Sequence, residues 1–180
     1  MTAVTQDPFA SIKEATVAHQ RSHRCGSHPF DDGPQLTAWA AGVEARTVVE
    51  LGTSLGYSAA CFAAAGARVH TVDRDPVHVD EARRLLKDHK LSRRVDCRVG
   101  EGVGVLATLP ANSADVAFFD GMEPSLAEID VLIRSLRPGG LLIASNMTLG
   151  GEAAEVRELL ATWQHTDLGL NLLAIKPEKA

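Results

Sequence analysis

Short runs of apolar and β-branched residues alternate with segments of helical periodicity from residue 47 to the end of the sequence. Such alternation is typical of parallel strands joined by crossover helices. The runs predict strands at about 47–51, 68–73, 94–99, 114–120, 140–145 and 170–176, and a weaker one near 162–167. We therefore expect a doubly wound α/β sandwich built on a mostly parallel, seven-stranded sheet.

Glycine and proline mark the starts of the intervening helices. Proline suits a first helical turn, where its missing N–H is not needed, and glycine permits a tight turn into a helix. The helices are predicted to begin near Gly56, Pro76, Gly102, Pro124 and Gly151.

A helix and a loop are expected before the first strand. Asp7-Pro8 is typical of an N-cap followed by proline at the first helical position. Two glycines and two prolines between Arg24 and Pro34 end this helix in a loop. The residues that recur on one face of the helix are Phe9, Ile12, Thr16, His19 and His23.

His19 and His23 lie four positions apart, which matches a two-histidine metal pair on one helical face. No third ligand at a suitable spacing is evident in the sequence. For these two residues we therefore favour packing of the helix over metal binding.

Length and charge restrict the classes of function. A chain of 180 residues suits one domain, and its formal net charge of −5 argues against a general nucleic-acid binder. The amino terminus lacks a basic start followed by an apolar run, and no apolar stretch reaches the roughly 18 residues of a membrane span. We expect a cytoplasmic protein with a small-molecule partner, and no interaction with nucleic acid or membrane.

The segment Gly52-Thr53-Ser54-Leu55-Gly56 contains G-x-S-x-G, the pattern around a hydrolase's nucleophilic serine. That arrangement needs several strands before the serine, whereas only one helix and a loop are expected before Val48. His165 is also the only histidine after His89. These observations favour a glycine-rich turn that approaches a cofactor.

Two acidic residues refine the cofactor hypothesis. Asp73 ends the second predicted strand, 21 positions after Gly52, where a carboxylate can accept hydrogen bonds from a ribose. The alternative is that Asp73 caps the helix at Pro76. Glu50 would repel a pyrophosphate but can hold a cationic group. Because G-x-G-x-x-G is also missing, a cofactor with an amino acid moiety and no phosphate fits best.

Motifs in this order and spacing continue over residues 34 to 176. They are Val49-Glu50-Leu51-Gly52-Thr53-Ser54-Leu55-Gly56-Tyr57-Ser58, Thr71-Val72-Asp73, Gly100-Glu101-Gly102, Val116-Ala117-Phe118-Phe119-Asp120, Leu136-Arg137-Pro138-Gly139-Gly140 and Gly169-Leu170-Asn171-Leu172-Leu173-Ala174-Ile175-Lys176. With them the sequence resembles the class I S-adenosylmethionine-dependent methyltransferases. Within that class it resembles the O-methyltransferase family that includes catechol and caffeoyl-CoA O-methyltransferases.

The resemblance implies a Rossmann-like methyltransferase fold and S-adenosylmethionine as the cofactor. It places Glu50, Gly52 and Ser58 at the methionine end, Asp73 at the ribose, and Glu101 with Gly102 by the adenine. For Glu101, an acid that complements a helix dipole stays an equal alternative. The full set of expected cofactor positions is Glu50, Gly52, Ser54, Gly56, Tyr57, Ser58, Asp73, Arg74, Gly100, Glu101, Gly102 and Asp120.

The chain departs from the family where the acceptor is expected. Metal-dependent members carry an Asp-Asn pair after the fifth strand, and here the pair reads Ser145-Asn146. Only Asp120 and Asn146 are left as ligands, which would bind magnesium weakly, so we expect no divalent metal. The lysine assigned as the base in the family aligns with Glu123. The lysine-plus-metal mechanism therefore does not carry over.

Asp120 is expected to face the methyl group and the acceptor. The candidate catalytic residues are Asp120, Glu123 and His28, with His19 and His23 as further candidates for a base. We expect a core domain at residues 34–180, with residues 1–33 as a helix and loop that cover its cleft.

The function that we expect is metal-independent O-methylation of a small molecule. The alternative is a non-catalytic S-adenosylmethionine-binding protein. The family resemblance also allows a homodimer.

Overall fold

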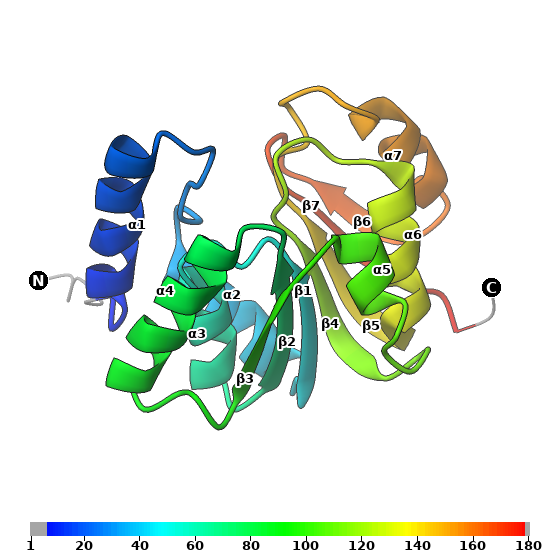
Figure 1. Ribbon diagram of the computed structural model, residues 1–180. Helices are drawn as coiled ribbons and strands as arrows, with labels where there is room; N and C mark the ends of the chain where they lie inside the picture. Colours follow the sequence, from blue (N-terminus) through cyan, green and yellow to red (C-terminus); the bar gives the residue numbers. More distant parts are fainter. Residues whose placement is uncertain (1–6, 179–180) are drawn as a thin grey trace, which may run out of the picture.

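The computed structural model describes residues 7–178, in which the strands form one sheet with helices on both faces (Figure 1). The strands are β1 (Thr47–Leu51), β2 (Arg68–Asp73), β3 (Val95–Val99), β4 (Ala114–Phe119), β5 (Leu136–Ala144), β6 (Gln164–Asp167) and β7 (Leu172–Ile175). The helices are α1 (Ala10–His23), α2 (Gly33–Gly42), α3 (Tyr57–Ala64), α4 (Pro76–Asp88), α5 (Gly102–Leu106), α6 (Leu126–Ser135) and α7 (Ala153–Leu160).

The sheet has the strand order β3-β2-β1-β4-β5-β7-β6. The first five strands of this order pair in parallel, and β7 runs antiparallel to both β5 and β6. The mostly parallel, seven-stranded sheet predicted from the sequence is confirmed. The chain runs outward from β1 through β2 to β3 and then returns to β4 on the other side of β1. Ligands of such sheets bind beside the carboxyl ends of the strands where the order reverses.

Alternate residues of each central strand face opposite sides of the sheet, and both sides are buried. Val48 and Phe118 pack under helices α1 to α4, whereas Val49 and Phe119 pack under α5 to α7. This explains why the strands read as continuous apolar runs, since a parallel sheet is covered on both faces.

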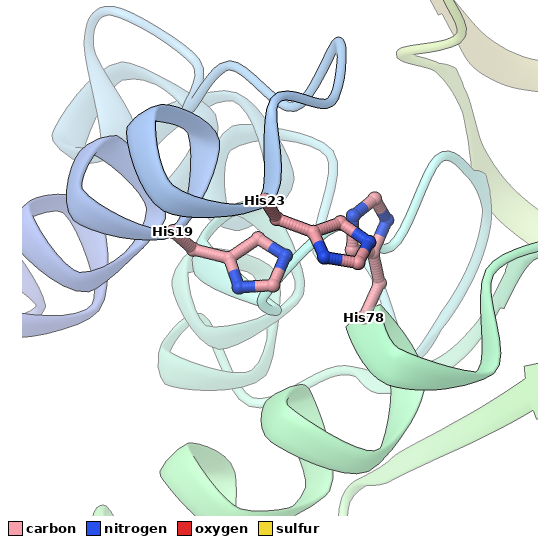
Figure 2. Close-up of side chains that lie close together, drawn as sticks. All are labelled: His19, His23 and His78. Atoms are coloured by element: carbon pink, nitrogen blue, oxygen red, sulfur yellow. The ribbon is translucent and has the colours of Figure 1, made fainter.

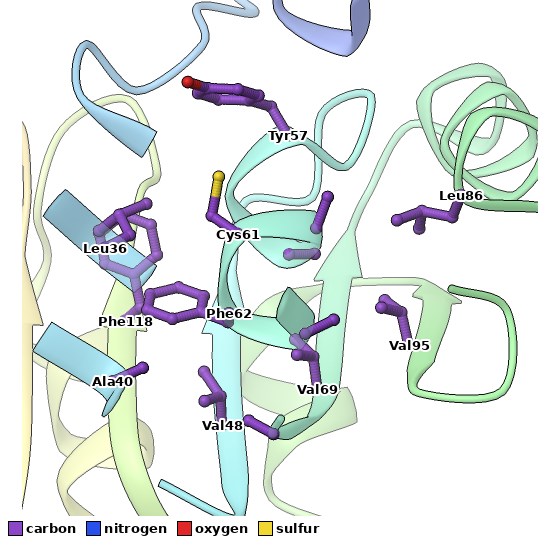
Figure 3. Packing of buried hydrophobic residues seen from close by; sticks show 14 of the residues in the cluster. Leu36, Ala40, Val48, Tyr57, Cys61, Phe62, Val69, Leu86, Val95 and Phe118 are labelled. Carbon is purple, nitrogen blue, oxygen red and sulfur yellow. The ribbon is translucent and has the colours of Figure 1, made fainter. Parts of the chain in front are cut away.

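The core beneath α2 and α3 contains an aromatic cluster (Figure 3). The rings of Phe62 and Phe118 meet edge to face with centroids 5.4 Å apart, and Phe30 meets Phe118 in the same way at 5.8 Å. Edge-to-face contact is a favoured geometry of aromatic pairs. Phe30 belongs to the loop after α1, so this contact anchors the N-terminal segment to the sheet.

Strand β5 begins at Leu136, earlier than the predicted start at residue 140. Ala114 of β4 pairs with Leu136, and the register then shifts so that Val116 pairs with Leu141. The residues between these pairs include Pro138 and Gly139. Both types are poor strand formers, so the sequence pattern missed this part of the strand.

All five helices predicted to follow the first strand begin within two residues of the expected glycine or proline. Helices α3, α4 and α5 begin at or directly after Gly56, Pro76 and Gly102. Helix α6 begins two residues after Pro124, because Ser125 is its N-cap, and α7 begins two residues after Gly151.

The predicted N-cap at Asp7 is wrong. The N-cap of α1 is Phe9, and Pro8 lies before the helix. The Asp7 carboxylate accepts a hydrogen bond from the Phe9 N–H at 2.9 Å, which closes a turn ahead of the first helical residue. An Asp-Pro pair suits such a turn as well as a cap, and the sequence alone did not separate the two.

No helix among residues 7–178 is long and apolar enough to cross a membrane.

Candidate functional site

Glu50 lies near the carboxyl end of β1 and is fully buried. One carboxylate oxygen, Oε1, accepts a hydrogen bond from the Ser58 hydroxyl of α3. The other, Oε2, is buried and has no partner within residues 7–178. Burial raises the pKa of Glu50 to about 7, against the opposing effects of the Ser58 and Thr71 hydroxyls. An unpartnered buried carboxylate oxygen is costly unless a ligand supplies a donor or a positive charge.

The turn after β1 begins at Gly52, whose φ is +103°. A Cβ atom added to Gly52 would lie 2.4 Å from the backbone oxygen of Asp120, which follows β4. The Asp120 N–H donates to the Leu51 carbonyl at 2.8 Å, and the Gly52 N–H donates to the Val72 carbonyl of β2 at 2.9 Å. The lack of a side chain at Gly52 therefore lets the ends of β1, β2 and β4 meet.

Gly56 ends the same turn with φ +86° and is the N-cap of α3. A Cβ atom there would lie 3.2 Å from Leu86 Cδ1 of α4. Ser54, between these two glycines, also has a positive φ of 46°. Its hydroxyl donates to the Ser27 hydroxyl at 3.0 Å, so the turn touches the loop after α1.

The Asp73 carboxylate bridges the turn after β1 and the start of α4. Its Oδ2 accepts from the Ser54 N–H at 2.8 Å, and its Oδ1 accepts from the Asp75 N–H at 2.9 Å. Asp75 is the N-cap of α4 and accepts from the Val77 N–H at 2.8 Å. The alternative that Asp73 caps this helix is therefore wrong. Each Asp73 oxygen keeps acceptor capacity after these bonds, because a carboxylate oxygen has two lone pairs.

Asp120 lies at the carboxyl end of β4 and is only partly exposed. The pKa of its carboxyl lies well above the ordinary value, because of its burial first and then the charges of Glu50 and Asp31. Glu50 and Asp120, whose carboxyl groups both have raised pKa values, therefore lie at the ends of the neighbouring strands β1 and β4. A cationic ligand would be stabilised at this edge of the sheet.

Tyr57 is buried, and its hydroxyl contacts the N-terminal segment. The hydroxyl donates to the Asp7 carboxylate and accepts from the Gly33 N–H at 3.2 Å. A Cβ atom at Gly33 would lie 2.4 Å from the Tyr57 oxygen, so this contact requires glycine. The expected cofactor residue thus ties the N-terminal segment to α3.

The predicted adenine positions lie after β3. The Gly100 N–H donates to the Asp73 carbonyl at 3.0 Å, and a Cβ atom at Gly102 would lie 2.5 Å from Leu51 Cδ1. Glu101 is the exposed N-cap of α5, and its side chain makes no capping hydrogen bond. Arg74 is exposed as well. Glycines here allow the turn after β3 to pack against the ends of β1 and β2.

Of the candidate acceptor residues, Ser145 and Asn146 lie beside the tip of β4, because Ala144 of β5 pairs with Phe119 of β4. Ser145 donates to Asn171 Oδ1 at 2.8 Å, and the Asn146 amide donates to the Gly121 carbonyl at 2.6 Å. Glu123 is exposed. His28 is also exposed, and its Nε2 lies 2.5 Å from the side-chain amide of Gln20 on α1. In the described part of the chain, neither Glu123 nor His28 makes a hydrogen bond to Asp120.

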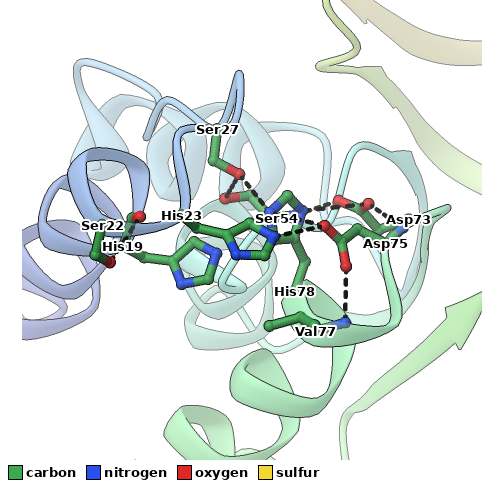
Figure 4. A network of polar contacts seen from close by, with 9 residues as sticks. All are labelled: His19, Ser22, His23, Ser27, Ser54, Asp73, Asp75, Val77 and His78. Atoms are coloured by element: carbon green, nitrogen blue, oxygen red, sulfur yellow. Dashed lines mark hydrogen bonds and ion pairs between the residues drawn. The ribbon is translucent and has the colours of Figure 1, made fainter.

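Sequence reasoning missed His78, which is buried beside Asp73 (Figure 4). Its Nδ1 lies 3.4 Å from Asp73 Oδ1, and its Nε2 lies 3.4 Å from the Ser27 hydroxyl. His78, Ala82 and Leu85 recur at helical spacing on the buried face of α4. This periodicity is the signal that would have identified His78 as an inward-facing polar residue.

The fold and the strand-end residues together define a doubly wound cofactor-binding domain. It has a glycine turn after β1, a buried acid before that turn and a carboxylate at the end of β2. The chain belongs to a methyltransferase domain family, whose sequence profile matches residues 49–147.

Two curated relatives are catechol O-methyltransferases. The chain is 32% identical to that of Mycobacterium tuberculosis over 123 residues, which is 66% of this chain and 56% of the relative. It is 30% identical to that of Niastella koreensis over 132 residues, which is 69% of this chain and 60% of the relative. The chain thus spans about three fifths or less of the length of these relatives.

Solved structures match over almost the whole chain. A methyltransferase from Geobacter sulfurreducens has a TM-score of 0.75 and 25% identity, with 93% of this chain and 88% of that chain covered. An O-methyltransferase from Bacillus cereus in complex with SAH has a TM-score of 0.78 and 22% identity, with 97% and 94% covered. The predicted family resemblance and fold class are confirmed.

Proposed function

We propose that this chain binds S-adenosylmethionine and transfers its methyl group to an oxygen atom of a small molecule, without the family's divalent metal. The observation that carries this proposal is the buried, unpartnered Oε2 of Glu50. An ammonium group would satisfy that oxygen, and the methionine part of this cofactor carries one. The SAH complex of the similar Bacillus cereus enzyme and the names of the curated relatives support the same chemistry.

The remaining cofactor contacts are assigned by position. Asp73 would accept hydrogen bonds from the ribose hydroxyls, since its oxygens keep acceptor capacity beside the two backbone N–H groups. Glu101, exposed at the start of α5, would lie by the adenine. The backbone of the turn at Gly52 to Gly56 would contact the methionine part.

S-adenosylmethionine supplies an electrophilic methyl group. The chain's main contribution to an in-line transfer is then to position the acceptor. Good orientation of the two reactants can lower the activation barrier by about 7–11 kcal/mol. Asp120 would hold the proton of an acceptor hydroxyl, because its raised pKa brings the carboxylate closer to the range where a general base works at neutral pH. Glu123 and His28 are weaker candidates because both are exposed.

The chemistry of the available donors supports a reaction without the family's metal. Hard divalent cations prefer several carboxylate oxygens, and Asp120 is the only carboxylate among the three residues at that position. Ser145 offers a neutral hydroxyl that is already bonded to Asn171, and the amide of Asn146 is bonded to the Gly121 carbonyl.

We also propose that the loop after α1 covers the cofactor cleft. Ser27 contacts Ser54 of the turn after β1, and a Cβ atom at Gly26 would lie 2.8 Å from Met122 Sδ, after β4. The loop therefore reaches both strand ends between which the cofactor is expected. Residues 1–6 of the predicted covering segment lie outside the described residues. A cytoplasmic location and a homodimer stay predictions.

Calorimetric titration with S-adenosylmethionine tests the cofactor assignment. We expect saturable binding to the parent chain, at least a tenfold loss in Glu50→Gln and no change in Glu155→Gln, which alters an exposed acid on α7. No binding to the parent chain would refute the proposal.

S-adenosylhomocysteine formation with a panel of hydroxylated aromatic compounds, with and without magnesium, then tests the reaction. Binding without turnover on any acceptor would favour the alternative of a non-catalytic binding protein. Turnover that requires magnesium would contradict the metal-independent reaction.

A further inference from the structure

Three histidines from two helices meet at the surface between α1 and α4. His19 and His23 project from α1 toward His78 of α4 (Figure 2). One potential ligand atom from each residue lies within 4.8 Å of the other two. The ring centroids of His19 and His23 are 4.8 Å apart, and those of His19 and His78 are 5.1 Å apart. The structure thus supplies the third ligand that the sequence spacing did not reveal.

Two nitrogens of this cluster, His19 Nε2 and His78 Nδ1, are buried and make no hydrogen bond within residues 7–178. His78 Nδ1 lies 3.4 Å from the Asp73 carboxylate, so it has a charged neighbour. Buried polar atoms are normally satisfied, and His19 Nε2 therefore lacks a partner among the described protein atoms. A metal ion bound between the two helices would supply that partner.

A carboxylate lies beside the imidazoles. Asp75 Oδ2 is 3.3 Å from His23 Nε2 and 3.5 Å from His78 Nε2 (Figure 4). Three imidazoles and one carboxylate match the nitrogen and oxygen donors of tetrahedral zinc sites. Asp75 also holds the N-terminus of α4 through the Val77 N–H, which fixes its carboxylate next to the cluster.

We propose that His19, His23 and His78 bind a zinc ion, with the Asp75 carboxylate as a fourth ligand or as a hydrogen-bond partner of a ligating histidine. In a tetrahedral site with Zn–N distances of about 2.0–2.1 Å, two ligating nitrogens lie roughly 3.3 Å apart. The ligand atoms lie within 4.8 Å of one another, so metal binding would bring them closer by up to about 1.5 Å. This position differs from that of Asp120 and Asn146, where the metal-dependent relatives of the family would bind magnesium.

The surroundings give a cation access to the cluster. His19 lines a surface hollow of about 320 Å³ whose other walls are Val77, Asp80, Glu81 and Arg84. Two of these residues are acidic, and Arg84 is engaged with Glu81 at the surface. A dissolved divalent ion can therefore approach His19 through a region that contains carboxylates.

A bound ion would join α1 to α4. His78 also lies 3.4 Å from the Asp73 carboxylate, so the same link would reach the carboxylate assigned to the ribose. We therefore infer a structural role for the ion, in which it fixes the N-terminal segment beside the strand ends. The metal site itself does not depend on the methyltransferase assignment.

Cobalt titration of the untagged, full-length protein tests the site after removal of metals with a chelator. We expect one Co²⁺ per chain, with the visible absorption of a tetrahedral complex, and its displacement by one Zn²⁺. His23→Ala and His78→Ala should each weaken binding at least a hundredfold. His165→Ala, which alters an exposed histidine on β6, should bind like the parent chain. No absorption in the parent chain, or binding that survives in His23→Ala, would overturn the assignment.

His23 is exposed, so its substitution keeps the test valid if His78→Ala does not fold. Cys25→Ser should retain cobalt binding, and its loss would assign the site to the thiol instead of the three histidines. Thermal unfolding gives a second readout without enzyme activity. At a hundredfold excess of Zn²⁺ over its dissociation constant, the Tm should rise by on the order of 5–10 °C in the parent chain. An equal rise in His23→Ala would contradict the site.

Discussion

Replacing Glu50 by glutamine should remove much of the pH dependence of stability in the cofactor-free protein. Burial raises the pKa of Glu50 from 4.5 to about 7, so the folded protein binds more protons than the unfolded chain between these values. Stability then falls as the pH rises through this range, and the whole penalty is present above pH 7. At 1.36 kcal/mol per pH unit, the difference corresponds to about 3 kcal/mol at high pH.

The test compares the free energy of unfolding at pH 5 with that at pH 8. The Glu50 contribution to the free energy of unfolding should fall by about 2–3 kcal/mol between pH 5 and pH 8. We expect Glu50→Gln to lack this fall in urea unfolding, and Glu155→Gln to keep it. The glutamine NH₂ would be buried without a partner, at a cost of about 1–3 kcal/mol that does not vary with pH. The informative quantity is therefore the change in the free energy of unfolding with pH, and not its absolute value.

Asp120 also lowers the stability as the pH rises, in the parent chain and in Glu50→Gln, because its pKa is raised as well. Part of that rise comes from the charge of Glu50. Saturating S-adenosylmethionine should also flatten the pH profile of the parent chain, because its ammonium would stabilise the ionised Glu50. An unchanged fall in Glu50→Gln would refute the reasoning that this carboxyl is buried and unpaired.

Three further substitutions test the geometry of the strand ends. Gly52→Ala should destabilise the fold by about 2–4 kcal/mol in urea unfolding, because φ is +103° and the new Cβ would meet the Asp120 carbonyl; wild-type stability would contradict that contact. Asp73→Ala should abolish measurable cofactor binding in calorimetry, since charge-assisted hydrogen bonds contribute about 1.5–3 kcal/mol each, and unchanged affinity would remove the ribose assignment. Tyr57→Phe should lower the free energy of unfolding by about 1–3 kcal/mol through loss of the bonds to Asp7 and Gly33. A loss below about 0.5 kcal/mol would show that these bonds do not hold the N-terminal segment.

The sequence predicted the sheet because each central strand is an apolar run and each crossover begins at a recognisable turn. The sequence predicted the structure less well where the same pair of residues suits two different local conformations. Asp7-Pro8 reads as a helix cap but closes a turn before the helix. Pro138 and Gly139 read as a break but lie within β5, where the register shifts.

For the site, spacing along the chain predicted that Glu50 and Asp73 lie at the carboxyl ends of neighbouring strands, where the structure has them. It could not reveal that Gly52 is required by the Asp120 carbonyl, since that contact joins residues far apart in the sequence. The same limit applies to His78, which meets His19 and His23 only because α1 packs beside α4. Contacts between distant segments are set by tertiary packing, which no local pattern encodes.

The contact between Gly52 and the Asp120 carbonyl fixes a distance through the main chain. Two side chains proposed to face an acceptor, Glu123 and Ser145, lie outside this contact, whereas the Asn146 amide bonds to the Gly121 carbonyl directly after it. Substitutions at Glu123 and Ser145 would therefore leave the spacing between the cofactor turn and the tip of β4 in place. In a methyltransferase this arrangement lets substrate preference diverge while the path of the methyl group keeps its length.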